Sequence, residues 1–484
     1  MKTHQTHHKK VLLRGFDTIT QHQAEQTLAQ AGYTMASTLT TAEVVIVGPL
    51  GFNVETLGPD PKKIVLTWED LRKNLQHSSP RPTRDLPRRP VIEQGHDSVR
   101  IVGITVPLNR ATGGQVPPVE RFRRICLDAP FLSAARAVAL GAAHGLPTAL
   151  EGVTAAAKTT VVLWVAHLLR QPVARLNLNG QTDTTELIGR YVPAGQGDEG
   201  WDLAALSRLG HLLKPECLSI IERAMAEGRP LDWAESTLIS AHSGLTRPRW
   251  RFQEGVVPQA MRRGGWVLLD EMNLAEPQIL ERLNPVLECP SNLLLTEGDG
   301  TWLGQGGVPV HQGFRVFAAM NPSDYAGRSA LSPAFKDRFL NWFQAQPPGE
   351  AEYRSQLQFL IHGRHPEVVM DGCIYQAAPV EPVHGLLATV DGIDGWIDAL
   401  ASCQASLSVG SVGRRDGILF TRRSLNALLD LWVARIREGG TSTARASLAA
   451  SLKDLYWNRI ATPADRNAAI GVAEAAGLPM EETP

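Results

Sequence analysis

The sequence predicts an α/β fold built on a parallel sheet, and three observations lead to this prediction. From about residue 99 to residue 345, short apolar runs alternate with stretches of helical periodicity, which is typical of strands joined by crossover helices. An apolar strand at Thr148–Leu150 runs through a glycine into a helix at Val161–Leu169. Further strands are predicted at Val173–Leu178, Trp266–Leu269 and Phe314–Ala319, and the last two are followed by acids and by an asparagine, respectively.

The first 77 residues predict a small α/β unit of their own. Residues 1–9 form a polar, His-rich tip, whose histidines we interpret as solvated side chains and not as a metal site. The apolar pattern of residues 10–77 predicts a strand–helix unit with strands at Val11–Phe16, Val44–Val47 and Ile64–Leu66. Helices are predicted at Ile19–Ala31, which Gly32 ends, and from Trp68 to about Leu75.

Residues 78–98 have the composition of a linker. Four prolines alternate with four arginines along this stretch, namely Pro80, Pro82, Pro87 and Pro90 with Arg81, Arg84, Arg88 and Arg89. Proline stiffens a chain, and a segment this polar is not expected to bury a core. We therefore expect a solvated tether, although its basic side chains could also contact an acidic partner.

Composition bounds the remaining possibilities. The 484 residues allow two or three domains at a typical ~150 residues each. The formal net charge of -1 gives no general argument for nucleic-acid binding. The sequence has no apolar run of the ~18 residues that a membrane span requires, and its N-terminus lacks the apolar core of a signal peptide. The five cysteines form no CxxC pair, which favours free thiols in a cytoplasmic protein.

The segment from Gly152 to Thr160 is a candidate phosphate-binding loop, because it follows a strand and opens a helix. Backbone N–H groups at the helix start would bind phosphate oxygens, with help from the helix dipole. Lys158 would reach the β- and γ-phosphates, and the Thr159 hydroxyl would bind Mg²⁺. The candidate nucleotide-binding residues are Gly152, Ala155, Ala156, Ala157, Lys158, Thr159 and Thr160.

This loop departs from the usual GxxxxGK[ST] pattern at one position. The residue before the lysine is Ala157 where a glycine is expected. Its Cβ could crowd the phosphates or resist an unusual backbone conformation. Taken alone, the segment could equally be an alanine-rich turn, so its interpretation depends on the motifs that follow.

Three later side chains complete a candidate hydrolytic site. Asp270 and Glu271 follow a buried strand, where the first could hold the Mg²⁺ shell and the second could polarise a water. Asn321 ends the next strand and could orient that water. Acids also occur at helix starts without any catalytic role, so the pair is weak evidence in isolation. Strands that deliver such groups in this order to one sheet edge match the place where α/β folds bind nucleotides.

Together these segments resemble the AAA+ ATPases, and within them the MoxR and dynein-related, midasin-like branch. The resemblance covers roughly residues 130–345 well and the mainly helical residues 345–475 loosely. It is carried by Gln181–Gly189, Leu268–Ala275, Leu280–Asn284, Ala319–Pro322 and the Arg338-Phe339 pair. It implies a P-loop AAA+ core over residues 99–345, with a parallel sheet, and a helical lid within residues 346–484.

The resemblance also implies a role for each motif. Lys158 and Thr159 correspond to Walker A, Asp270 and Glu271 to Walker B, and Asn321 to sensor 1. Arg338 corresponds to the arginine finger that reaches a neighbouring subunit, with Arg328 as a second candidate for such a contact. Arg423 corresponds to sensor 2, and Arg422 is its competitor. The implied catalytic residues are Glu271, Asn321, Arg338 and Arg423, and the implied metal ligands are Thr159 and Asp270.

For the whole protein, the resemblance implies a cytoplasmic, hexameric ring that binds ATP and Mg²⁺ and remodels a protein partner. In this branch the partner often carries a von Willebrand A domain. An insert between Gly180 and Gly265 and a hairpin at Leu293–Gln312 would line the ring pore. Two alternatives remain open at this point, namely a nucleotide-gated scaffold with weak hydrolysis and an ATPase subunit of a DNA-acting complex.

The N-terminal unit resembles a BRCT domain through Thr40–Gly48 and through Trp68 in its last helix. Phosphate-reading members carry Ser or Thr before their first glycine, whereas Arg14 precedes Gly15 here. The resemblance therefore implies the fold without the phosphopeptide function, although Arg14 or Lys63 could hold an anion. BRCT units and basic linkers recur in genome maintenance, which is why the DNA-acting alternative is kept.

Overall fold

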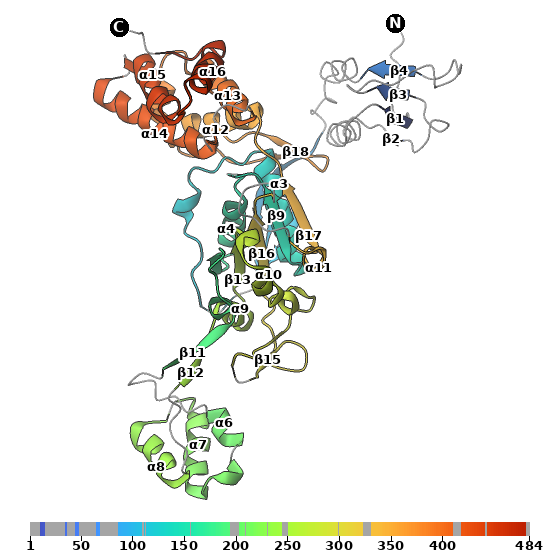
Figure 1. Ribbon diagram of the computed structural model, residues 1–484, viewed down its shortest axis with the longest axis vertical. Coiled ribbons are helices and arrows are strands. Elements are labelled where there is room, and N and C mark those ends of the chain that lie inside the picture. The colour runs from blue at the N-terminus through green and yellow to red at the C-terminus, as the bar shows by residue number, and fades with distance from the viewer. Residues whose placement is uncertain are drawn as a thin grey trace. The chain divides into compact units, whose positions relative to one another are not determined.

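The computed structural model divides the chain into two units, Met1–Leu86 and Pro87–Pro484, which are described separately (Figure 1). In the first unit it describes residues 10–14, 34–35, 44–47, 64–67 and 86. In the second it describes residues 87–480, apart from 109–110, 112, 155, 194–202, 209, 230, 244–249, 299, 323–330, 410–417 and 441–442.

The N-terminal unit contains a parallel four-stranded sheet with the order β2-β1-β3-β4. Its strands are β1 (Lys10–Arg14), β2 (Thr34–Met35), β3 (Val44–Val47) and β4 (Ile64–Thr67). Three of these strands are the ones predicted from apolar, β-branched runs, and β2 is an addition. The predicted tip at residues 1–9 and the two predicted helices lie outside the described residues. The BRCT resemblance stays a prediction.

The prediction of a solvated linker at residues 78–98 is wrong for its second half. These residues form β5 (Arg88–Pro90), β6 (Ile92–Gln94) and the start of β7 (Ser98–Ile101). Val91 between β5 and β6 is only 3% exposed, and its N–H donates to the carbonyl oxygen of Gln376 at 3.0 Å. Arg88, one of the supposed tether cations, pairs with Glu367 at 2.7 Å.

The misreading has a physical reason. β5 is the edge strand of the sheet β18-β19-β5, and proline is tolerated on an edge because one side of the strand needs no ladder hydrogen bonds. The few apolar positions among the prolines and arginines therefore suffice to anchor the segment. Residues 78–85 lie outside the described residues.

The next strands also differ from the predicted parallel pattern. Strand β8 (Ile104–Pro107) pairs with β7, and β7 with β6, in an antiparallel meander. Val99, Ile101 and Val106 of this meander share a core with the helix α3 (Ala129–His144). The meander thus covers one side of α3, while the parallel sheet begins only at the following strand.

The central sheet has five parallel strands in the order β10-β13-β16-β9-β17. They are β9 (Thr148–Gly152), β10 (Val173–Asn177), β13 (Trp266–Asp270), β16 (Arg315–Met320) and β17 (Asn341–Ala345). The first four confirm strands predicted from the sequence, whereas β17 was not predicted. Because β16 lies between β9 and β13, the carboxyl ends of these three strands are neighbours.

Alternating side chains of the sheet build two separate cores. Leu150, Leu268 and Phe317 pack with α3 and with α4 (Lys158–Leu168) on one face. Val267, Leu269 and other buried side chains of the sheet pack on the opposite face with α9 (Val256–Arg263) and α10 (Pro277–Glu281). Each large apolar side chain buried in this way contributes about 1.5–3 kcal/mol to folding. The sheet is therefore held rigidly between two helical layers.

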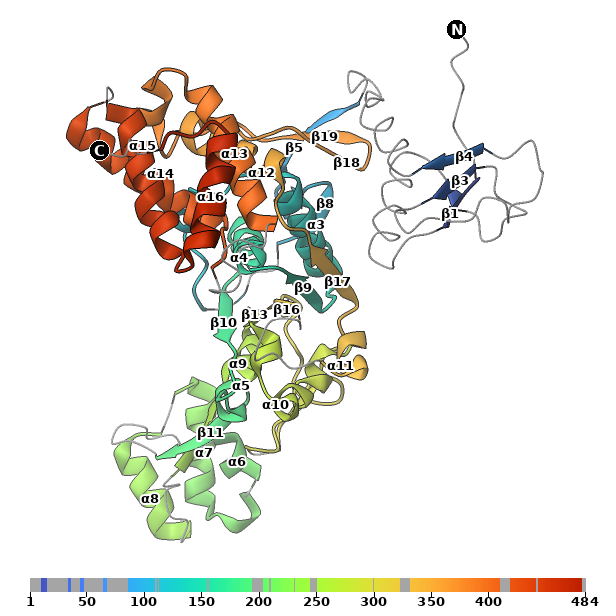
Figure 2. The same cartoon turned by 45° about the horizontal axis from the view of Figure 1, so that its top comes forward.

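An inserted subdomain accounts for the long interval between the phosphate loop and Asp270. After α5 (Thr184–Leu187), β11 (Gly189–Pro193) and β12 (Trp250–Glu254) form an antiparallel ribbon. The chain between them folds into α6 (Leu203–Arg208), α7 (Pro215–Glu227) and α8 (Trp233–Ser243), which have their own small core. Figures 1 and 2 show these three helices grouped at the end of the ribbon. The predicted hairpin at residues 293–312 contains β14 (Leu293–Leu294) and β15 (Trp302–Leu303).

Helices dominate after β17, as predicted. They are α12 (Glu350–His362), α13 (Ile393–Val409), α14 (Arg422–Gly439), α15 (Ala444–Leu455) and α16 (Pro463–Ala475). Their common core includes Trp432, whose indole N–H donates to the carbonyl oxygen of Ala444 at 2.9 Å. A hairpin of β18 (Val368–Met370) and β19 (Cys373–Gln376), which was not predicted, interrupts this series and pairs with β5. Among the described helices, none has the length and apolar character of a membrane span.

The burial of Val91 gives a direct test of the corrected linker. We expect Val91→Ala to lower the free energy of unfolding by about 1–3 kcal/mol, because it leaves a cavity beside β5 and β6. The matched control is Val119→Ala, since Val119 is 54% exposed and its truncation leaves no cavity. Urea unfolding of the two variants measures the difference. Equal stability of both variants would restore the tether interpretation.

Candidate functional site

The phosphate loop connects β9 to α4 and begins at a glycine that sterics require. A Cβ added at Gly152 would lie 2.6 Å from the carbonyl oxygen of Ala345 on the neighbouring strand β17, so a larger residue cannot fit without a shift. Lys158 is the first residue of α4, and its side chain folds back over the loop. Its Nζ donates to the carbonyl oxygens of Gly152 at 2.7 Å and of Val153 at 2.9 Å. Ala155 lies outside the described residues.

Ala157 adopts the backbone conformation that explains why glycine is usual at this position. Its φ of 58° and ψ of 16° are left-handed, and it forms the N-cap of α4 without a side-chain hydrogen bond. An L-residue with a Cβ is strained in this region by roughly 1–2 kcal/mol. The loop therefore keeps the turn that precedes the helix, and the alanine adds strain there.

Asp270 and Thr159 meet as the motif order predicts. Asp270 is the last residue of β13 and is buried. The Thr159 hydroxyl donates to both of its carboxylate oxygens at 3.0 Å. A hydroxyl and a carboxylate are oxygen ligands of the kind that Mg²⁺ accepts. These two side chains would hold the cation that a bound nucleotide brings.

Glu271 and Asn321 form the second half of the site. Glu271 has a left-handed φ of 53°, an uncommon conformation that clusters at functional sites. The Asn321 Nδ2 donates to both Glu271 carboxylate oxygens at 3.1 Å, and its Oδ1 accepts a hydrogen bond from Lys158 Nζ at 2.9 Å. One amide thus joins the loop lysine to the acid. Asn273, which sequence reasoning did not assign, supports this strand end by donating to the carbonyl oxygen of Asn321 at 2.8 Å.

Arg175 is a site residue that the sequence analysis missed. It lies on β10, next to β13, and its Nε and Nη2 donate to Asp270 Oδ2 at 2.9 and 2.6 Å. The available signal was a single charged residue within the strand predicted at Val173–Leu178. That signal could not show which neighbouring strand the arginine would face.

These side chains surround a cavity of about 360 Å³, here called the phosphate cavity. Its walls include the loop residues Ala156, Ala157, Lys158, Thr159 and Thr160. Four basic side chains and two acidic ones line it, namely Arg121, Lys158, Arg175 and Arg423 with Asp270 and Glu271. The excess of positive charge suits a triphosphate whose charge is partly balanced by a divalent cation. The residues present therefore fit ATP and Mg²⁺.

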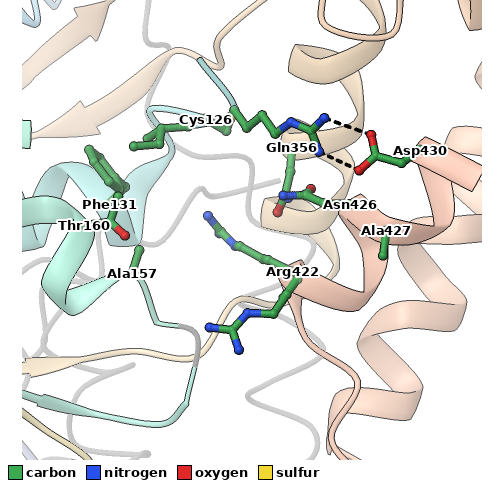
Figure 3. Close-up of a pocket in the computed structure, with 12 residues that line it drawn as sticks. Cys126, Phe131, Ala157, Thr160, Gln356, Arg422, Asn426, Ala427 and Asp430 are labelled. Carbon is green, nitrogen blue, oxygen red and sulfur yellow. Dashed lines mark hydrogen bonds and ion pairs between the residues drawn. The ribbon is translucent and has the colours of Figure 1, made fainter. Parts of the chain in front are cut away.

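A second cavity of about 460 Å³ adjoins the first and shares Ala157, Thr160 and Arg423 with it. Figure 3 shows its walls, which come from α3 and the start of α4 on one side and from α12 and α14 on the other. Phe131 and Cys126 supply apolar surface, and burial raises the pKa of the Cys126 thiol, so it stays neutral. The Gln356 amide of α12 donates to Asn426 Oδ1 of α14 at 2.7 Å. This cavity has the apolar and amide surface that suits a nucleotide base.

Two ion pairs bind the helical region to the chain before α3. Arg124 donates two hydrogen bonds to Asp430, at 2.7 and 2.9 Å, and the dashed lines that end at Asp430 in Figure 3 mark them. Arg422 pairs with Asp128, whose carboxylate also caps α3 through the Phe131 N–H at 3.1 Å. Burial raises the pKa of Asp128, and the Arg422 charge acts against that rise. The helical region is thus tied to the core on the side of the second cavity.

The two competing arginines of α14 therefore have different surroundings. Arg422 is engaged with Asp128, whereas Arg423 is exposed and lines the phosphate cavity. Arg338 lies at the end of α11 (Pro333–Asp337), donates to the carbonyl oxygen of Ala334 at 2.7 Å, and does not line either cavity. Arg328 lies outside the described residues.

Comparison with known proteins agrees with this arrangement. The family model of the AAA domain, dynein-related subfamily, matches residues 232–339, a range that includes Asp270, Glu271 and Asn321. Midasin of Giardia intestinalis is 30% identical over 203 residues, and midasin of Dictyostelium discoideum is 29% identical over 243 residues. These matches cover 41% and 42% of this chain, and this chain spans about 4% of the length of either midasin.

A bacterial protein shows a shorter match. The uncharacterised protein YojN of Bacillus subtilis is 34% identical over 89 residues, which are 18% of this chain and 27% of that protein. The matched family model, the five-stranded parallel sheet and the phosphate loop at its edge lead to one conclusion. The chain has the fold of an AAA+ P-loop ATPase.

Proposed function

We propose that this protein is a ring-forming AAA+ ATPase, assembled as a homohexamer, that couples ATP binding and hydrolysis to the remodelling of a protein partner. The observation that carries this proposal is the network of Lys158, Asn321 and Glu271 beside the Thr159–Asp270 pair. These groups come from three neighbouring strand ends and face one cavity. They match the charge and the chemistry that phosphoryl transfer to water requires.

Each side chain has a role that follows from its position. Lys158 would move from the loop carbonyls to the phosphate oxygens, since both are acceptors for its ammonium group. Glu271 would accept the proton of the attacking water, and Asn321 is placed to orient that water through its amide. Thr159 and Asp270 would hold Mg²⁺, which when bound offsets negative charge on the phosphates. Arg423 would contact the phosphates from the helical region.

The location of Arg338 supports an assembly. It lies outside the phosphate cavity of its own chain, although the resemblance assigns it to the γ-phosphate. An arginine that completes the site from a neighbouring subunit resolves this mismatch. A head-to-tail contact of this kind forms a closed ring when the rotation between successive subunits adds up to a full turn.

The inserted helices support a protein partner. Leu212 of this subdomain is 64% exposed, and Tyr191 and Met225 are also exposed apolar side chains. Apolar residues on a subdomain that projects on a ribbon suit contact with another protein. A partner with a von Willebrand A domain remains our proposal for its class, on the strength of the family resemblance alone.

One observation favours a second candidate, a nucleotide-gated scaffold with weak hydrolysis. The strained Ala157 lies where the backbone must approach the phosphates. A Cβ at this position could hold the γ-phosphate away from Glu271. Nucleotide binding would then act on the helical region through its ion pairs with the core, with little turnover.

Subunit mixing tests the ring mechanism. We expect Glu271→Gln to abolish turnover, because the base is lost, and Arg338→Ala to abolish it by removing the neighbour's cation. An equal mixture of the two variants should regain roughly a quarter of wild-type activity, because some interfaces then pair an intact Glu271 with an intact Arg338. Phosphate release measured at several protein concentrations gives the readout, and the wild-type specific activity should rise with concentration.

Two results would contradict this mechanism. Undiminished turnover in Glu271→Gln would remove the base from its role. A wild-type specific activity that is independent of concentration, together with no recovery in the mixture, would show that each chain works alone. The control variant is Arg262→Gln, which breaks a 2.8 Å ion pair with Glu254 away from both cavities.

Ala157→Gly separates the ATPase from the scaffold. We expect the variant to be more stable by about 1 kcal/mol, because glycine adopts the left-handed conformation without strain. For an active ATPase we expect turnover to change less than about twofold, since the alanine loop already forms the required turn. Thermal unfolding and phosphate release measure the two effects. A large increase in turnover at unchanged nucleotide affinity would favour the scaffold candidate for the wild-type chain.

A further inference from the structure

The Asp270 carboxylate is surrounded by hydrogen-bond donors. Its Oδ2 accepts from Nε and Nη2 of Arg175 at 2.9 and 2.6 Å. Its Oδ1 accepts from the Glu271 backbone N–H at 3.2 Å, and both oxygens accept from the Thr159 hydroxyl at 3.0 Å. A carboxylate offers about four acceptor positions. The directions from which a cation could approach Asp270 are therefore taken by protein donors.

The two partners of the Arg175–Asp270 ion pair differ in their freedom to move. The Asp270 side chain is 8% exposed and is fixed at the end of a central strand, whereas the Arg175 side chain is 44% exposed. Arg175 lines the phosphate cavity, so its guanidinium can leave Asp270 and still face bound phosphates. Among the donors named around Asp270, Arg175 is the charged one. It donates to Oδ2, which also accepts from the Thr159 hydroxyl.

We propose that Arg175 is a positioning residue that neutralises Asp270 before nucleotide binds and that it and a divalent cation exclude each other at this carboxylate. This inference rests on the proposed ATP and Mg²⁺ site. When the cation takes Asp270, the guanidinium turns towards the phosphate oxygens, for which its planar fork is well suited. Arg175 thereby keeps Mg²⁺ from binding strongly until a nucleotide is present.

Mg²⁺ alone, without nucleotide, gives the first test. We expect millimolar Mg²⁺ to change the melting temperature of the wild-type chain little, because binding must first break the ion pair. In Arg175→Gln the carboxylate is released, so the Mg²⁺ concentration for half of the maximal thermal shift should fall by on the order of tenfold. Arg175→Lys keeps a charge but loses the two-donor contact, so its Mg²⁺ response should lie between those of the wild type and of Arg175→Gln. Arg175→Gln with Asp270→Asn should lose the shift.

The matched control is again Arg262→Gln, since the Arg262–Glu254 pair is partly exposed and lies away from the cavities. It should respond to Mg²⁺ as the wild type does. An Mg²⁺ response of Arg175→Gln equal to that of the wild type would overturn the proposal. So would a response of Arg175→Gln that persists after Asp270→Asn, because the cation would then bind elsewhere.

Nucleotide affinity gives a second, independent readout. A fluorescent ATP analogue is titrated in EDTA and in Mg²⁺. The quantity compared between variants is the dissociation constant in EDTA divided by the dissociation constant in Mg²⁺. In Arg175→Gln we expect this ratio to rise by on the order of tenfold. Without metal, the unpaired Asp270 carboxylate repels the triphosphate, whereas with metal the loss of a competitor for Asp270 offsets the loss of a phosphate contact. An equal loss of nucleotide affinity in EDTA and in Mg²⁺ would make Arg175 a simple phosphate contact. It would overturn the proposal that Arg175 and the cation exclude each other at Asp270.

The two arms separate this proposal from the function on which it rests. If the wild-type chain binds no nucleotide in either buffer, the proposed ATPase fails, and the Mg²⁺-only arm still decides whether Arg175 and the cation compete for Asp270. If nucleotide binds but the ratio and the Mg²⁺ response do not depend on Arg175, the ATPase proposal stands and the role of Arg175 falls.

Discussion

The side-chain amide of Asn321 is the interaction on which the rest of the site depends. It accepts from Lys158 of the loop after β9 and donates to Glu271 after β13, so it fixes two strand ends to each other. This is possible only because β16 lies between those strands in the sheet. The strand order in turn requires crossover connections, which α4 and the long inserted region provide. A local hydrogen-bond network thus depends on the topology of the whole core.

Backbone strain is concentrated at the same sheet edge. Ala157 and Glu271 both have left-handed conformations, one before α4 and the other after β13. Each costs free energy that the surrounding packing must supply, and the two cores that enclose the sheet do so. In return, the turn at Ala157 lets α4 start at Lys158, and the turn at Glu271 brings its carboxylate to the Asn321 amide. The strain is therefore located where the side chains must converge.

Periodicity and motif order predicted the parallel strands and the residues at their ends, because both depend on local sequence. Contacts between distant segments were not predictable in this way. Arg175 was visible only as a charge in a strand, and its pairing with Asp270 depends on which strands are neighbours. The β5–β6 segment was taken for a linker, since its prolines and arginines hid the burial of Val91, which comes from pairing with the distant β19. The different surroundings of Arg422 and Arg423 likewise depend on the position of α14 beside the core.

The described site contains opposite charges and hydrogen-bond partners that already pair with one another, and a nucleotide that binds as proposed would act on these pairs. Lys158 is held by loop carbonyls and by Asn321, and Asp270 is held by Thr159 and Arg175. A ligand gains affinity only by the difference between the bonds that it offers and the bonds that it breaks. Under the proposed exchange, a cation alone would displace Arg175 from Asp270 and leave its guanidinium without the phosphate oxygens that a bound triphosphate would offer. If the proposed exchange holds, the Arg175–Asp270 pair favours the nucleotide–cation complex over the cation alone.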